Sequence, residues 1–203
     1  IAAANVHFAQ PLAGVVDVHD GQGFFVVSQD GIAGQLQVTV TAPFFTGTFG
    51  LAVNTTMHAV SEQFQVAQTT VALNLPAGPY LRVQGTGIRL DVAGQRASAD
   101  VAFEKAKVGS SDVIRVLITN ASASFGDGTT SFATLTGGSG FLILRSGTPS
   151  TMAGELSGNV AITIPGVSVE GRFSLAINTS ATPVTNETLA FGPQPGATRA
   201  LAV

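Results

Sequence analysis

Apolar and polar residues alternate along several stretches of the chain. In the stretch 167–177 every second position is apolar or glycine, and the positions between them carry mostly serine, glutamate and arginine. The stretch 99–104 alternates in the same way. Because successive strand residues point to opposite faces of a sheet, this period of two predicts strands with one apolar face. No stretch has the period of 3.6 residues that indicates an amphipathic helix.

Glycine-containing pairs separate these stretches. Asp-Gly pairs at 20–21, 30–31 and 127–128, and a Pro-Gly pair at 165–166, favour tight hairpin turns. In the stretch 80–92 the apolar positions change phase at Gly85-Thr86-Gly87, which predicts a β-bulge or a bend. These signals predict an all-β fold of antiparallel meander or sandwich-like sheets.

Part of the sequence occurs twice in similar form. "GTFGLAVNTT" at 47–56 and "GRFSLAINTS" at 171–180 share six of ten residues. Upstream, "GQGFFVV" at 21–27 matches "GSGFLIL" at 138–144, and "AGQL" at 33–36 matches "AGEL" at 153–156. The spacing grows along the chain near turn-like stretches, as insertions in surface loops would cause. The matches predict an internal repeat of about 120 residues, with roughly seven strands in each period.

The repeat divides the chain unequally. Residues 1–115 form a first β-repeat that starts in mid-repeat, and residues 116–203 form a second, incomplete one. The sequence therefore resembles a window from a longer array. Because unpaired strand edges adhere to other strands, we expect residues 1–8 and 198–203 to lie at sheet edges where another repeat or another copy docks.

Composition narrows the function further. Only 10% of the residues are charged and the net charge is −3, which gives no electrostatic footprint for nucleic acid. The chain has no cysteine, so disulfides and thiolate chemistry are excluded. It also has no run of 18 apolar residues, so we expect no transmembrane segment.

Motifs of catalysis are missing. Ser139 lies in "GGSGF", which lacks the spacing of a nucleophile elbow, and no phosphate-binding glycine motif is complete. The "DVHD" stretch at 17–20 could contribute metal ligands, but the second copy reads "TLTG" there, so a polar hairpin surface is the better interpretation. The twelve acidic residues are scattered rather than paired. We therefore expect a protein that is not an enzyme, with no catalytic, cofactor-binding or metal-binding residues.

Four asparagines stand in N-x-Ser/Thr sequences, which are glycan acceptors in eukaryotic secretory proteins: Asn54, Asn120, Asn178 and Asn186. The sequence leaves open whether any of them is glycosylated. Asn54 and Asn178 occupy the same repeat position. At such a position an Asn-Thr pair ends a strand with a local side-chain hydrogen bond, and we favour this interpretation.

The segments "GSGFLIL…AGELSGNVAITIPGVSVEGRFSLAINT" and "VQGTGIRLDVAGQRASADVAFEK" resemble tandem β-repeats of very large exported, adhesin-like bacterial proteins. The resemblance covers most of the chain and concerns turns and alternation. It implies an extracellular or cell-surface location and a role in a fibre or stalk.

Two functions follow as expectations. The first is a non-catalytic structural repeat module of a surface fibre or matrix, whose partners are neighbouring repeats or copies of itself end to end. The alternative is an adhesin-type module that binds glycan or Ca²⁺ through loops such as "SFGDGTTS" at 124–131. Glycan platforms usually expose aromatic rings, and this chain has no Trp and one Tyr.

Overall fold

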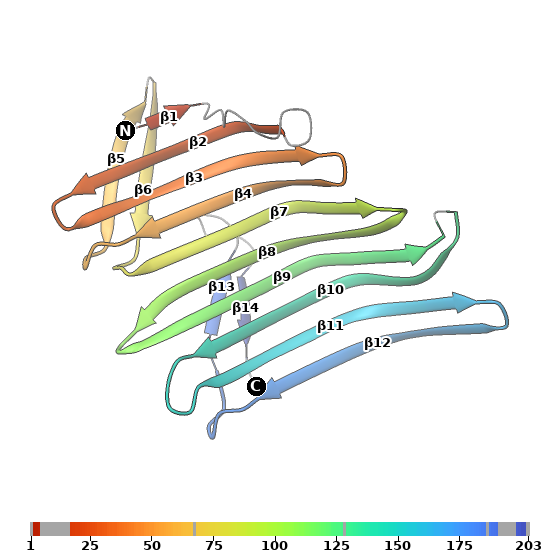
Figure 1. Cartoon of the computed structure of the whole chain (residues 1–203). Coiled ribbons are helices and arrows are strands. Elements are labelled where there is room, and N and C mark those ends of the chain that lie inside the picture. Colours follow the sequence, from red (N-terminus) through yellow and green to blue (C-terminus); the bar gives the residue numbers. More distant parts are fainter. Residues whose placement is uncertain are drawn as a thin grey trace.

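The computed structural model describes residues 2–4, 17–66, 68–127, 129–185, 187–190 and 198–201. All regular structure in these residues is β-strand, which confirms the expected fold class at the level of an antiparallel all-β protein. Ten strands form one sheet in which sequence neighbours pair, except that β7 follows β4 (Figure 1). They are β1 (Ala2–Ala4), β2 (Asp17–Ser28), β3 (Gly31–Ala42), β4 (Phe45–Asn54), β7 (Tyr80–Val92), β8 (Gln95–Val108), β9 (Ser111–Gly126), β10 (Ser131–Arg145), β11 (Thr151–Ile164) and β12 (Val167–Asn178).

Two separate hairpins lie on one face of this sheet, behind it in the view of Figure 1. The first consists of β5 (Val60–Val66) and β6 (Thr69–Leu75) and is inserted between β4 and β7. The second consists of β13 (Glu187–Ala190) and β14 (Thr198–Leu201) and follows β12. We call the face that they cover the hairpin face and the opposite one the open face. No helix in the described residues is long and apolar enough to span a membrane.

Each hairpin covers its own apolar core. Under the first, Leu73 and Leu75 pack with Ala33 and Tyr80 of the sheet. Under the second, Val184 and Leu189 pack with sheet residues from β8 to β11: Ala102, Val113, Leu117, Phe141, Ile143 and Ala153. Burying this apolar surface stabilises the fold, because each fully buried aliphatic side chain contributes about 1.5–3 kcal/mol. The hairpin face therefore holds two cores side by side on one sheet.

Two of the four hairpin turns expected from sequence are present, and one expected pair, at 127–128, includes Gly128, which lies outside the described residues. The pairs at 30–31 and 165–166 lie at the β2–β3 and β11–β12 hairpin turns. The expected bulge is confirmed, because the β7–β8 register shifts between Gly85 and Ile88. The expected hairpin at 20–21 is wrong: Asp20 has a φ of 53° inside β2, where the register with β3 shifts. Asp-Gly favours a left-handed backbone in a bulge as well as in a hairpin turn.

The matched sequence blocks pair in the same register. Gly23 lies opposite Leu36, which lies opposite Leu51, and the matching residues Gly140, Leu156 and Leu175 are paired in the same order. The strands differ in their surroundings, because β4 also pairs with β7, whereas β12 pairs with β11 alone among the described strands. The local pairing is thus shared, and the position in the sheet is not.

The expectation for the two ends holds in part. Ala2–Ala4 form β1 at an edge of the ten-stranded sheet. Thr198–Leu201 pair with β13 in the second hairpin, so they also lie at a sheet edge, but at that of the two-stranded sheet and not of the large one. The remaining residues of 1–8 and 198–203 lie outside the described part of the chain. β13 and β14 leave the large sheet after β12, as β5 and β6 leave it after β4.

Candidate functional site

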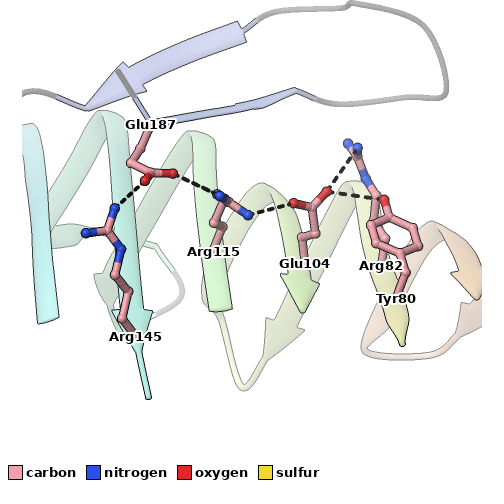
Figure 2. Close-up of polar contacts among 6 residues, drawn as sticks. All are labelled: Tyr80, Arg82, Glu104, Arg115, Arg145 and Glu187. Atoms are coloured by element: carbon pink, nitrogen blue, oxygen red, sulfur yellow. Dashed lines mark hydrogen bonds and ion pairs between the residues drawn. The ribbon is translucent and has the colours of Figure 1, made fainter. Parts of the chain in front are cut away.

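A row of charged side chains crosses the hairpin face from β7 to β10 (Figure 2). Arg82, Glu104 and Arg115 are direct cross-strand partners on β7, β8 and β9, so their side chains point to the same side. Arg115 Nη1 lies 3.2 Å from Glu104 Oε1, and Arg82 Nη1 lies 4.0 Å from Glu104 Oε2. The register alone therefore alternates positive and negative charges along the row.

The second hairpin completes the row. Glu187 of β13 accepts hydrogen bonds from Arg115 Nε and Nη2, at 3.1 and 2.9 Å, and from Arg145 Nη2 of β10. Four of the five charged side chains are only 14–16% exposed, and Arg145 at the end of the row is 39% exposed. Charges with so little access to water need partners, and the alternation supplies them.

Tyr80 joins the row from β7. Its hydroxyl donates a hydrogen bond of 3.2 Å to Glu104 Oε2. Burial, and after it the Glu104 carboxylate, together raise the pKa of Tyr80 to about 12, although the Arg82 guanidinium acts to lower it. Tyr80 is therefore neutral at every physiological pH and acts as a hydrogen-bond donor.

Arg82 is the incomplete member of the row. Its Nε and Nη2 are buried, and no described residue accepts a hydrogen bond from either. A buried donor without a partner costs about 1–3 kcal/mol, and more when the group is charged. The two atoms are the side-on pair of donors with which guanidinium binds carboxylate in bidentate fashion.

Arg82 lines a cleft of about 200 Å³ on the hairpin face. Two small residues of β4, Gly50 and Ala52, contribute to it where larger side chains would fill the space, and a Cβ at Gly50 would lie 3.0 Å from the side chain of Gln84. Five amide side chains line the cleft together with Arg82: Gln22, Gln35, Gln37, Asn74 and Gln84. The cleft thus combines one cation with many groups that both donate and accept hydrogen bonds.

The metal interpretation of the "DVHD" stretch has no geometric support. His19 Nδ1 lies 2.8 Å from Asp20 Oδ2, and both side chains are substantially exposed on β2. Nowhere in the described residues do three His, Cys, Asp or Glu side chains come together as metal ligands would. The side chain of Asp17 lies outside the described part. We find no Ca²⁺-binding cluster for the alternative function to use among the described side chains.

The loop at 124–131 is held in shape by hydrogen bonds between its own residues. Asp127 Oδ1 accepts hydrogen bonds from the Thr129 and Thr130 backbone N–H groups, at 2.9 and 2.7 Å, and from the Thr129 hydroxyl at 2.7 Å. These hydrogen bonds, the one from Thr130 foremost, lower the pKa of Asp127 to about 2. One carboxylate oxygen is therefore already committed to shaping the loop.

The asparagines at the repeat position end their strands as expected. Thr56 donates its backbone N–H and its hydroxyl to Asn54 Oδ1, at 2.9 and 2.8 Å. Ser180 does the same to Asn178 Oδ1, at 2.9 and 2.7 Å. Asn120 lies within β9, where its amide donates to Asp100, and Asn186 lies outside the described residues. The local hydrogen-bond interpretation is confirmed for Asn54 and Asn178.

Comparison with known proteins gives no match: no family model, no curated protein and no solved structure resembles the chain at a significant level. The site therefore has to be interpreted from its own chemistry. Sequence reasoning missed the charged row, because Arg82 and Glu187 are far apart in the sequence and meet only through strand register and hairpin placement.

Proposed function

We propose that the protein is a non-catalytic structural module of an extracellular or cell-surface fibre or matrix, built on a β-repeat of about 120 residues. In this proposal the open face of its sheet packs against the same face of a second copy. The observation that carries it is the apolar surface of the open face. The resemblance to exported bacterial repeats supports the setting, and the shared register of the matched blocks supports the repeat.

The open face is apolar over its whole width. Fourteen large apolar side chains on it are between 36% and 67% exposed: Val27, Ile32, Leu51, Val83, Leu90, Val92, Phe125, Leu156, Ile162, Ile164, Val167, Val169, Leu175 and Ile177. Together they expose apolar area on the order of 1,000 Å², whereas a monomer rarely exposes more than a few hundred, and each partner of a stable complex buries roughly 800. Water contact over such an area is unfavourable, so the face requires a cover.

A second sheet of the same kind is the best cover. Sheets pack face to face through interdigitating aliphatic side chains, and the residues of the open face are mainly Val, Ile and Leu. Lys105, Lys107 and Asp112 are the charged residues that β3 to β12 place on this face, and Asp112 pairs with both lysines. A lipid surface would favour Trp, Tyr and unpaired basic residues at its rim, and the single tyrosine faces the other way.

Strand edges offer a second contact. β12 has 12 residues and pairs with β11 alone among the strands that the structure describes, so its other side presents backbone N–H and C=O groups to a further strand. Edge-to-edge addition of copies would extend the sheet into a filament, as an end-to-end fibre module requires. In this proposal two copies dimerise through their open faces, and the dimers join into a fibre through their strand edges.

The test is the mass of the protein in solution, measured by sedimentation and light scattering at micromolar concentration. We expect a dimer or larger species. The double variant Leu175→Lys with Val169→Lys puts charges on the open face and should yield a monomer. Ser174→Lys, on the hairpin face of the same strand, should leave the association unchanged. A monomeric wild-type protein, or one that binds neutral lipid vesicles in preference to itself, would overturn the proposal.

A further inference from the structure

We propose that the cleft at Arg82 binds a carboxylate-bearing sugar, a uronate, with the carboxylate on Arg82 Nε and Nη2. This is a small-molecule site on the hairpin face, independent of the contact proposed for the open face. It belongs to the same broad class as the glycan-binding alternative, but it uses a cleft under the first hairpin instead of an exposed loop.

The first step is the geometry of the guanidinium. Arg82 Nη1 is the nitrogen directed to Glu104, 4.0 Å from its carboxylate. Nε and Nη2 form the other edge of the planar group. The guanidinium is close enough to the Tyr80 hydroxyl to lower the pKa of Tyr80, but neither buried nitrogen donates to a described residue in hydrogen-bond geometry. Two parallel N–H donors at fixed separation match the two oxygens of one carboxylate, which gives this pairing its strength and its directionality.

The second step is charge. The row contains three arginines and two glutamates, Arg82, Arg115 and Arg145 against Glu104 and Glu187, so it carries one net positive charge. Arg145 at one end is 39% exposed and is solvated by water, whereas the Arg82 side chain at the other end is 15% exposed. Arg82 is thus the less solvated of the two ends of the row, and an anion bound there would offset the net positive charge.

The third step selects the kind of anion. Among the described residues that line the cleft Arg82 alone is charged, so a doubly charged phosphate would find a single cation there. The surrounding Gln and Asn amides match hydroxyl groups instead, because each amide offers both a donor and an acceptor. The cleft of about 200 Å³ is smaller than the 300–1,000 Å³ typical of sites for drug-sized ligands, which suits one sugar ring.

The fourth step concerns how the cleft arises. The register places Ala52 directly opposite Arg82, and Gly50 directly opposite Gln84. At these positions β4 has no side chain larger than a methyl group, so the side chains of the neighbouring strands β3 and β7 border the open cleft. Asn74 and Leu75 of β6 form a wall of it, and this arrangement makes the first hairpin part of the site.

The experiment is a titration of the whole chain followed by NMR and calorimetry, with sodium glucuronate, glucose, sodium acetate and sodium phosphate as separate probes. We expect glucuronate to bind at least tenfold more tightly than acetate, and glucose not to bind measurably. Arg82→Lys keeps the charge but loses the paired donors, so it should weaken glucuronate binding at least tenfold. Arg89→Lys, exposed on the same strand and outside the cleft, is the matched control and should bind as the wild type does.

Each contrary outcome is decisive. Equal binding of glucose and glucuronate, tighter binding of phosphate, or unchanged binding by Arg82→Lys would overturn the proposal. If Arg82→Lys fails to fold, the Arg82 Nε–H resonance of the wild-type protein decides, because glucuronate must shift it and glucose must not. Repeating the titration with the Leu175→Lys, Val169→Lys variant separates this site from the proposed association through the open face.

Discussion

The two hairpin-capped regions of the sheet use the same local structure but fasten their hairpins differently. β4 and β12 both end in an asparagine whose side-chain oxygen accepts two hydrogen bonds from the residue two positions later. The intervening threonines also match. Thr55 donates its N–H to the Ile32 carbonyl at 2.9 Å, and Thr179 donates to that of Met152 at 2.8 Å.

The difference lies beyond this turn. Asn54 is fully buried, and its amide donates to the carbonyls of His58 and Pro76, at 2.8 and 2.7 Å, so it ties the end of the first hairpin to the sheet. Asn178 is exposed, and its amide donates to Thr182 in the segment that leads to the second hairpin, at 3.2 Å. The second hairpin is instead tied to the sheet by Glu187. Identical turns can therefore serve different tertiary attachments.

We expect the largest effect from a variant that breaks the attachment of the first hairpin at Asn54. Asn54→Ala removes a fully buried amide and leaves the Pro76 and His58 carbonyls and the Thr56 donors without their partner, so we expect a loss of about 3 kcal/mol in the free energy of unfolding. Asn178→Ala, at an exposed position, should cost about 1 kcal/mol. Urea unfolding of both variants measures the difference. Equal losses would show that the two asparagines serve the same purpose despite their different burial.

Part of this comparison could be predicted from sequence. The alternation in 167–177 predicted the strand that became β12, and the phase change at 85–87 predicted a bulge, because both signals depend only on local side-chain order. The asparagine turn was also predictable, since its hydrogen bonds join residues two positions apart. Local chemistry was sufficient for each of these features.

The candidate site was not predictable for the opposite reason. Arg82, Glu104 and Arg115 are aligned by the register of three long strands, and a shift of one residue would send any of them to the open face. Glu187 reaches them from a hairpin that leaves the sheet after β12. Likewise, the Asp-Gly pair at 20–21 has the chemistry of a hairpin turn, and only its pairing partners reveal a bulge.

The second prediction concerns a variant that breaks the attachment of the second hairpin at Glu187. Glu187→Gln removes the carboxylate that joins Arg115 and Arg145, so we expect about 2 kcal/mol of destabilisation and faster hydrogen exchange in β13 and β14. High salt should weaken this attachment more than the first one, because screening acts on ion pairs and not on amide hydrogen bonds. Glu62→Gln, at an exposed position in the first hairpin, is the control. Exchange that stays unchanged in β13 and β14 would argue against the ion pairs as the attachment.

The third prediction concerns Tyr80, which packs in the first core. Its pKa is about 12 in the folded protein against 10 for an ordinary tyrosine. Because the folded pKa is raised, the contribution of Tyr80 to stability is complete below pH 10 and is lost as pH rises towards 12. Tyr80 is the only tyrosine in the chain, so phenolate absorbance reports its titration directly, and we expect a midpoint near 12. Tyr80→Phe should cost about 1 kcal/mol at neutral pH through loss of the hydrogen bond to Glu104. A midpoint near 10 would mean that the hydroxyl is solvated and does not share in the charged row.

The smallest effect is expected at Asp127, which belongs to neither attachment. Its pKa is lowered from 3.8 to about 2 by hydrogen bonds within its own loop. Because the folded pKa is depressed, its contribution to stability is complete above about pH 4 and is lost as pH falls to 2. Asp127→Asn should therefore unfold at slightly lower urea concentration than the wild type at pH 6, and the two curves should approach each other towards pH 2. Hydrogen exchange in β5–β6 and in β13–β14 should change equally or not at all, since the hydrogen bonds of Asp127 join it to residues of its own loop. A selective loosening of one hairpin would mean that the β9–β10 loop is coupled to that hairpin, and that the two attachments are not independent of the rest of the sheet.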